Sequence, residues 1–442
     1  MRGKVVLFFP KVEEYKDFHY FPFSLLQICA PLIEKGIECK IIDERVNPNY
    51  EAELIKELGD AICFATTSFT GFAVTRALEV SKLVRNHFKD IPIVWGGPHA
   101  TALPKQTLES KYVDVVGIGF GDYIFNELIT ALLSGGDIGN ISGIGYKDKT
   151  GRIVVNHPSC SEKFDTTNMP QTPYWLIDVT KYINPKTRRF MYVSSYGCPG
   201  ICTFCSTKNQ RRWTPLDLRK VKKDIDYLLS SYDFKEIVFF DATMTTLRDR
   251  LLGIADFLKK YHVKWIADGR AIELYRWELA DIEKLVQSGL EQVTMGLETG
   301  SEHVVGIMKK GARHLEKYEI VTRKLAQFKI KQVSGLIFGT PGETISDLEK
   351  TVAYVKKIRN INPNFRISST FFRPLPGTEL YNMLIEQGFK MPGTLEEWAE
   401  NKSKTHYRYN EWMDILWMDP RTKAQYRRIY DGFMEENADI LQ

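Results

Sequence analysis

Three cysteines stand close together near the middle of the chain. Cys198, Cys202 and Cys205 lie within eight positions and follow the spacing C-x3-C-x2-C. Thiolate sulfur is the usual protein ligand of iron–sulfur clusters, and three thiolates can hold three corners of a [4Fe-4S] cluster. The fourth iron of such a cluster would stay open to a substrate or cofactor.

Zinc and thiol redox chemistry are the alternatives for these cysteines. A structural zinc site normally has four Cys or His ligands, and no histidine lies near the three cysteines in the sequence. A disulfide would pair two of the thiols and leave the third alone. The spacing therefore favours a cluster over zinc, redox thiols or cysteines that are merely buried.

The second half of the chain alternates apolar runs with amphipathic stretches, which is typical of repeated β/α units. We expect a parallel barrel or partial barrel whose chemistry lies at the carboxyl ends of the strands. Polar groups follow several strands there, although a strand-end salt bridge would also explain Asp241 or Arg270, and a solvated helix end would explain Lys309 and Lys310. The expected strands are 189–195, 236–240, 263–267, 292–297, 332–338 and 366–372.

The first half also alternates short apolar strands with helices, and the strands are apolar throughout. This pattern predicts a doubly wound α/β domain with a parallel sheet covered on both faces. Two loops after strands, 66–71 and 96–101, combine hydroxyls with glycines and suit an anionic or hydroxyl-rich ligand. Such a fold also needs glycine turns for purely structural reasons.

The cysteine motif, with Phe204 directly before its third cysteine, resembles the radical S-adenosylmethionine (SAM) superfamily. The stretches TTSFT, WGGPHAT and VVGIGFGD resemble the cobalamin (B12)-binding domain of the B12-dependent subfamily, over residues 4 to about 133. The resemblance implies an α/β chain in four parts. These are a Rossmann-like B12-binding domain (1–140), a hairpin and surface linker (141–188), a (β/α)6 partial TIM barrel (189–385) and a mainly helical C-terminal capping or substrate region (386–442).

The resemblance also implies roles for single residues. Cys198, Cys202 and Cys205 would bind the cluster, Glu298 the SAM ribose, and Arg270 the SAM carboxylate. Asp241 would lie near the SAM amine, and Phe204 and Ser368 would frame the adenine. The expected cobalamin-binding residues are Thr67, Ser68, Thr70, Gly96, Gly97, His99, Gly119 and Gly121. His19 is expected to be an ordinary loop residue and not a cobalt ligand.

The implied activity is a C-methyltransferase that acts on an unactivated carbon through a 5′-deoxyadenosyl radical and methylcobalamin. Its cofactors would be a [4Fe-4S] cluster, SAM and cobalamin, and its partners a small-molecule substrate and an external electron donor of the flavodoxin or ferredoxin type. One alternative keeps the architecture but carries out cyclisation, rearrangement or dehydration, with or without cobalamin. Another is a non-catalytic cobalamin- or nucleotide-binding module with a zinc site.

Bulk properties add limits. The 442 residues carry a net charge of only +5 without a clustered basic stripe, so no nucleic-acid partner is expected. No apolar run is long enough to span a membrane. Scattered cysteines suit a reducing compartment, and we expect a cytoplasmic protein. The substrate and the oligomeric state have no signal in the sequence.

Overall fold

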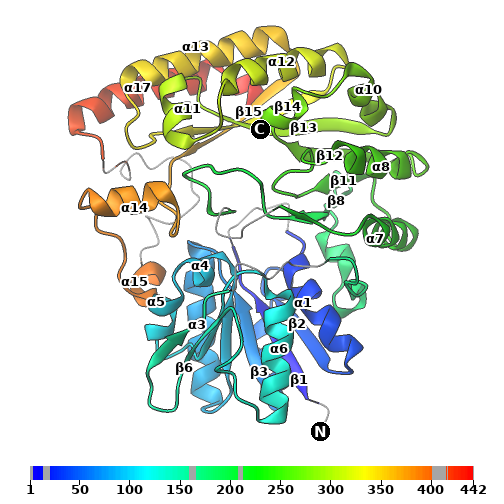
Figure 1. Cartoon of the computed structure of the whole chain (residues 1–442), viewed down its shortest axis with the longest axis vertical. Coiled ribbons are helices and arrows are strands. Elements are labelled where there is room, and N and C mark those ends of the chain that lie inside the picture. Colours follow the sequence, from blue (N-terminus) through cyan, green and yellow to red (C-terminus); the bar gives the residue numbers. More distant parts are fainter. Residues whose placement is uncertain are drawn as a thin grey trace. The chain divides into compact units, whose positions relative to one another are not determined.

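The computed structural model describes residues 3–12, 20–158, 166–207, 213–400, 415 and 417–441. Its contacts divide the chain into two compact units, and the elements of each can be followed in Figure 1. The first unit comprises Met1–Asn184, Leu375–Gly377 and Lys390–Tyr407, and the second comprises the remaining residues. His19 lies outside the described residues.

The first unit is built on a sheet with the strand order β2-β1-β3-β4-β5-β6-β7 in the described part of the chain. Strands β1 to β5 run parallel, and the β6–β7 hairpin extends the sheet in the antiparallel direction. β1 lies between β2 and β3 and is buried along its whole length, as its sequence KVVLFF predicts for a strand covered on both faces. The strands are β1 (Lys4–Phe9), β2 (Glu38–Asp43), β3 (Ala61–Thr67), β4 (Ile93–Gly96), β5 (Val115–Gly117), β6 (Ile144–Lys147) and β7 (Ile153–Val155).

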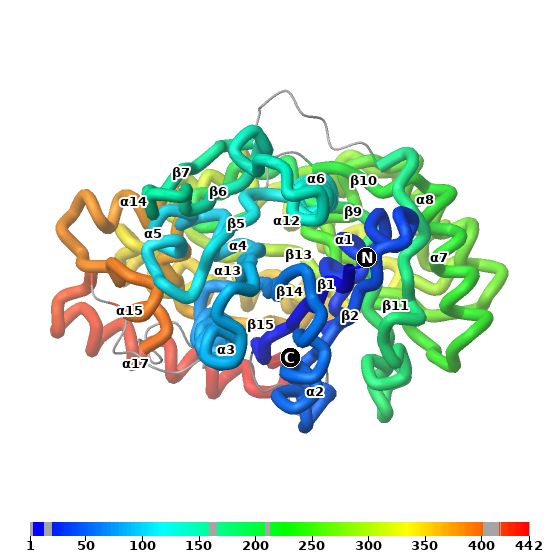
Figure 2. The backbone as a smooth tube through the Cα atoms, turned by 90° about the horizontal axis from the view of Figure 1, so that it is seen from below, coloured from blue at the N-terminus to red at the C-terminus, as the bar shows by residue number. Residues whose placement is uncertain are grey.

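Helices cover both faces of this sheet (Figures 1 and 2). They are α1 (Phe23–Glu34), α2 (Tyr50–Leu58), α3 (Phe72–His87), α4 (Gly97–Ala102), α5 (Pro104–Glu109) and α6 (Gly121–Ser134). The chain order reverses between β1 and β3, and ligands of doubly wound folds bind at such a switch point. The loop after β3 is therefore the expected ligand side.

The linker after the hairpin differs from the expected surface segment. It forms two short 3-10 helices, η1 (Tyr174–Leu176) and η2 (Val179–Tyr182), and Tyr174 and Tyr182 are buried. The hydroxyl of Tyr182 donates a hydrogen bond to Asp43 at 2.8 Å, and its ring meets Phe21 at 5.3 Å between centroids. The expectation was wrong because these aromatic rings complete the core of the first unit.

The second unit contains a six-stranded parallel sheet, in the described residues, with the order β15-β14-β13-β12-β11-β8. Sequential strands are neighbours, as in a partial (β/α) barrel. The strands are β8 (Arg189–Tyr192), β11 (Glu236–Phe239), β12 (Lys264–Gly269), β13 (Leu290–Glu298), β14 (Lys331–Phe338) and β15 (Phe365–Phe371), and a separate small ribbon pairs β9 (Ser195–Tyr196) with β10 (Thr214–Pro215). The fold class expected from the sequence is confirmed.

Helices pack against the outer face of this sheet, and side chains between the helices and the sheet form the core of the unit. Tyr192, Phe239 and Trp265 stack edge to face on the helix side of neighbouring strands, with centroids 6.0 Å apart. Aromatic pairs of this kind stabilise a core beyond their buried area. The helices are α7 (Leu218–Ser231), α8 (Arg248–Lys259), α9 (Ala271–Leu274), α10 (Leu279–Gln287), α11 (Glu302–Met308), α12 (His314–Gln327), α13 (Ile345–Ile361), α14 (Glu379–Glu386) and α17 (Pro420–Glu436), with the 3-10 turn η5 (Ala438–Ile440).

The last described helix of the first unit comes from far along the chain. α15 (Leu395–Glu400) follows α14 in sequence but packs on α3 and α5. None of the helices in the described part of the chain has the length and apolar character of a membrane span.

Candidate functional site

The cysteine loop begins where β9 ends and is fixed at Thr203. The N–H of Thr203 donates to the carbonyl of Met308 at 3.1 Å, and its hydroxyl donates to the carbonyl of Ile307 at 2.8 Å. Its own carbonyl accepts the N–H of Leu380 at 3.1 Å. These partners lie at the end of α11 and the start of α14, so two helices hold the loop between its second and third cysteines.

All three cysteines are half-buried free thiols. Burial raises the pKa of the Cys198 and Cys202 thiols, while the positive charge of Arg270 opposes this at Cys198 and that of Lys310 opposes it at Cys202. Nearby cations favour the thiolate, which is the form that binds metal. Within the described residues, no three His, Cys, Asp or Glu side chains are grouped around one ion position. Three free thiols on one loop supply the kind of donor that an iron–sulfur cluster takes, with one thiolate on each of three irons.

Arg270 stands at the end of β12 beside the cysteine loop. A Cβ added at Gly200 would lie 3.3 Å from the sulfur of Cys198 and 3.5 Å from Nη2 of Arg270. The guanidinium therefore lies next to the first cysteine across a bare stretch of backbone. A group that forms bidentate pairs with carboxylates is thus placed beside the cysteine loop.

Glu273 holds this guanidinium in place. Its Oε1 lies 3.1 Å from Nη1 of Arg270, while its Oε2 accepts hydrogen bonds from Thr243 at 2.9 Å and Thr245 at 2.6 Å. The N–H of Arg270 also donates to the hydroxyl of Thr245 at 3.0 Å. Both the backbone and the side chain of Arg270 are thereby fixed in one orientation.

Glu298 ends β13 in a left-handed conformation, with φ +64°, where the pairing with β14 is irregular. Such a backbone is unfavourable for a residue with a side chain and is often found at functional sites. Its carboxylate pairs with Nζ of Lys310 at 3.0 Å, and both side chains are largely buried. Burial tends to lower the pKa of Lys310, but the charges of Glu298 and Cys202 outweigh it, so the net pKa is raised.

A strip of bare backbone lies beside this carboxylate. Gly296, Gly335 and Ser368 are in register on three adjacent strands. A Cβ at Gly296 would collide with the Glu298 carboxylate, and one at Gly335 would lie 3.5 Å from it. Ser368 is exposed at the end of this strip, and the neighbouring Glu298 carboxylate is a group that can accept hydrogen bonds from a diol.

Asp241 is buried behind the cysteine loop. It accepts hydrogen bonds from the backbone N–H and hydroxyl of Ser194 and from the hydroxyl of Ser195. Burial raises its pKa to about 6. These contacts shape the chain that enters the loop, and the proximity of Asp241 to the SAM amine stays a prediction, as do the adenine contacts of Phe204, which is half-buried, and Ser368.

In the first unit, the loops after β3 and β4 interlock. The hydroxyl of Ser68 donates to the carbonyl of Gly96 at 2.8 Å, and the N–H of His99 donates to the carbonyl of Ser68 at 3.1 Å. Gly97 has φ +90°, and a Cβ there would lie 2.6 Å from Oγ1 of Thr67 and 2.7 Å from the backbone of Ser68. Only glycine permits this approach.

The remaining cobalamin candidates differ in position. Thr70 is half-buried and shares a hydrogen bond of 3.1 Å with Nδ1 of His99, whose side chain is fully buried. Gly119, with φ +97°, donates its N–H to Thr101, and Gly121 starts α6. The cofactor contacts predicted for these residues stay predictions, and the burial of His99 favours a supporting place behind the loop.

Two residues of this site have little or no signal in the sequence: Glu273 is unmarked, and a solvated helix end explains Lys310 equally well there. Lys310 instead points inward because Lys309 adopts a left-handed conformation, with φ 50°, and turns the chain at the end of α11. No spacing rule marks Glu273, although three threonines at 243, 245 and 246 gather on its carboxylate.

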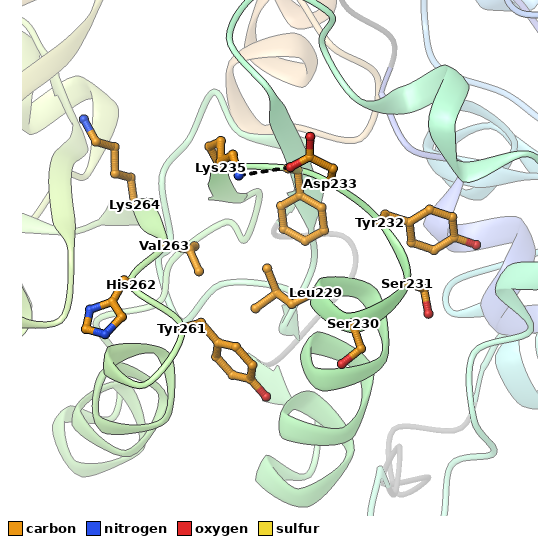
Figure 3. A pocket seen from close by; sticks show the side chains of 11 residues that line it. Leu229, Ser230, Ser231, Tyr232, Asp233, Lys235, Tyr261, His262, Val263 and Lys264 are labelled. Carbon is orange, nitrogen blue, oxygen red and sulfur yellow. Dashed lines mark ion pairs between the residues drawn. The ribbon is translucent and has the colours of Figure 1, made fainter.

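A hollow of about 770 Å³ lies elsewhere in the second unit (Figure 3). It is lined by the end of α7, the start of β12 and the connections α7–β11 and α8–β12, which include Asp233, Lys235 and His262. This is the amino end of the strands, whereas chemistry in such barrels lies at the carboxyl end. Lys235 and Asp233 pair with each other at 3.1 Å, and the hollow is not a candidate site.

Two protein-family models match the chain, the radical SAM superfamily over residues 192–355 and the B12 binding domain over residues 17–129. The chain belongs to the radical SAM superfamily and carries an N-terminal B12-binding domain. The family resemblance stated from the sequence is thereby confirmed, and the chain is a radical SAM enzyme.

Several curated proteins are similar over most of their length. An uncharacterized methyltransferase of Pyrococcus horikoshii is 28% identical, with 81% of this chain and 78% of that protein covered. The cytidylyl-2-hydroxyethylphosphonate methyltransferase of Streptomyces wedmorensis is 23% identical, with 84% and 79% covered. The anaerobic magnesium-protoporphyrin IX monomethyl ester cyclase of Synechocystis is 22% identical, with 83% and 73% covered.

Solved structures share the fold of this radical SAM enzyme. The methyltransferase TsrM of Kitasatospora setae, with cobalamin and a [4Fe-4S] cluster bound, has a TM-score of 0.74 at 16% identity. The superposition covers 100% of this chain and 89% of the TsrM chain. OxsB with aqua-cobalamin and SAM bound has a TM-score of 0.71 at 19% identity and covers 99% and 61%. The predicted cofactor set matches the groups bound in these two proteins.

Proposed function

We propose that this radical SAM enzyme is a B12-dependent methyltransferase that methylates an unactivated carbon of a small molecule. The observation that carries the proposal is the presence, in one chain, of both matched domains, with the three-cysteine loop bordered by Arg270, Glu298 and Lys310. Together, a reduced [4Fe-4S] cluster and SAM supply radical chemistry at carbon, and cobalamin supplies a methyl group.

The residues of the chain would bind and orient these groups. Cys198, Cys202 and Cys205 would hold the cluster through three thiolates. Arg270, fixed by Glu273, would bind the SAM carboxylate, and Glu298 would accept hydrogen bonds from the ribose hydroxyls over the bare glycine strip. In the first unit, the interlocked loops after β3 and β4 would bind cobalamin.

We further propose an electron donor of the flavodoxin or ferredoxin type, a substrate that is not a nucleic acid, and a cytoplasmic location. The absence of a clustered basic stripe supports the second statement. Cys29, Cys39 and Cys63 are buried free thiols, which suits a reducing compartment.

The proposal can be tested without knowing the substrate. Anaerobically reconstituted protein is incubated with hydroxocobalamin, a strong reductant and SAM labelled in its methyl group. We expect 5′-deoxyadenosine to form and the label to appear on protein-bound cobalamin. The Synechocystis relative is named a cyclase, and formation of 5′-deoxyadenosine without label transfer would favour that class of reaction instead.

A further inference from the structure

Residues 390–400, here called the brace segment, come after the barrel strands in sequence but belong to the first unit. Their helix α15 lies beside α3 in both views (Figures 1 and 2). The segment therefore contributes to the unit that contains the proposed cobalamin loops.

Specific hydrogen bonds hold the brace segment. The hydroxyl of Thr75 donates to the carbonyl of Ala399 at 2.8 Å, and the hydroxyl of Ser110 donates to Glu396 at 2.7 Å. The side chain of Gln106 accepts a bond from Nε1 of Trp398 at 2.8 Å and donates one to the carbonyl of Pro392 at 3.1 Å. These four bonds, one buried and three partly buried, fix the register of the segment.

Trp398 carries this anchoring to the loop after β3. Its ring is 3% exposed and meets His99 edge to face, with centroids 5.4 Å apart. His99 in turn bonds Thr70 through Nδ1 at 3.1 Å and Ser68 through its backbone N–H at 3.1 Å. Its Nε2 is buried and has no hydrogen-bond partner in the described part of the chain, so the ring is held on that side by packing.

We propose that Trp398 and His99 are positioning residues for cobalamin, through which the brace segment holds Ser68 and Thr70 in their binding arrangement. This inference rests on the proposed function of the first unit. Burial lowers the pKa of His99 to about 3, so the ring stays neutral and keeps the same hydrogen bond throughout the working pH range. Cobalamin binding near the start of the chain then depends on a residue about three hundred positions later, at 398.

The test compares full-length Trp398→Leu with Trp398→Phe, which keeps an aromatic ring against His99. Trp175→Leu is the matched control, because Trp175 lies in the same unit and is 63% exposed. Hydroxocobalamin affinity is measured by visible titration, and hydrogen exchange is followed in peptides that cover 67–70 and 96–102. We expect Trp398→Leu to bind about tenfold more weakly and to exchange faster in both peptides, and Trp175→Leu to stay close to the parent protein. Trp398→Phe should lie between the two, because it keeps a ring against His99 but loses the Nε1 bond to Gln106.

The outcomes distinguish the positioning role of Trp398 from the binding of cobalamin by the first unit. Parent-like affinity and exchange in Trp398→Leu would overturn the positioning role, as would an equal loss in Trp398→Leu and in Trp398→Phe. A parent protein that binds no hydroxocobalamin would overturn the proposed function and the cobalamin part of this inference together. The exchange data would still show whether the ring holds the loop.

Discussion

Nζ of Lys310 lies 3.0 Å from Oε1 of Glu298, and both side chains are mostly shielded from water beside the cysteine loop. The adjacent Lys309 instead pairs with Glu379 on the surface. Two neighbouring lysines thus occupy opposite environments, which provides a matched pair of variants.

We expect Lys310→Met to weaken SAM binding by about tenfold or more, because it leaves the buried Glu298 carboxylate without its partner. Lys309→Met removes only a surface pair and should change affinity less than about twofold. Equilibrium binding of SAM to reconstituted protein measures both. Equal effects of the two substitutions would contradict the assignment of Lys310 to the site.

Glu273→Gln should raise the KM for SAM by about tenfold while leaving the iron content unchanged. The substitution removes the negative charge that fixes the Arg270 guanidinium, and a loosely held guanidinium binds a carboxylate less well. Rates of 5′-deoxyadenosine formation over a range of SAM concentrations give the KM. Glu291→Gln, which alters an exposed pair with Lys264, is the control, and a KM for Glu273→Gln equal to that of the control would argue against this role.

Gly97→Ala should reduce hydroxocobalamin affinity by at least about tenfold. A Cβ at this position would lie within 2.7 Å of the Ser68 backbone, so the loop after β3 must move. Gly59→Ala, at the exposed C-cap of α2, has helical dihedral angles and would place its Cβ 3.6 Å from the nearest neighbouring atom, so it should bind as the parent does. Visible titration compares the two variants, and unchanged affinity in Gly97→Ala would exclude this loop from the binding site.

Glu343 should make stability fall as pH rises. Burial raises its pKa to about 7, although the N–H of Thr340 and the hydroxyl of Tyr426 each donate to its carboxylate at 3.0 Å. The folded protein thus holds this proton to higher pH than the unfolded chain, so stability is fullest below the unfolded pKa and is lost as pH rises toward 7.

The matching variant is Glu343→Gln, with Glu349→Gln at an exposed position of α13 as the control. Between pH 5 and pH 8, the free energy of unfolding of Glu343→Gln should gain on the order of 2 kcal/mol relative to the parent. Denaturant unfolding of cluster-free protein at both pH values measures this. If the difference in the free energy of unfolding between variant and parent is the same at pH 5 and pH 8, Glu343 does not titrate in this range.

Much of the fold followed from local patterns. Continuous apolar strands predicted parallel sheets, and the cysteine spacing located the loop that Thr203 fixes. The sequence does not show whether the Lys310 side chain points inward or into solvent. That depends on the left-handed backbone at Lys309, and only glycine would have marked such a conformation in the sequence. The return of Trp398 to the first unit was not predictable either, since a contact between positions 99 and 398 leaves no local periodicity.

The most direct test of the account is the reaction of the reconstituted enzyme with SAM. Anaerobically reconstituted protein should contain about four iron and four sulfide per chain and should form 5′-deoxyadenosine from SAM under strong reductant. The Cys198→Ala, Cys202→Ala and Cys205→Ala variants should lose both properties. A parent protein that binds zinc in place of iron, or that forms no 5′-deoxyadenosine with a full cluster, would contradict the central claim.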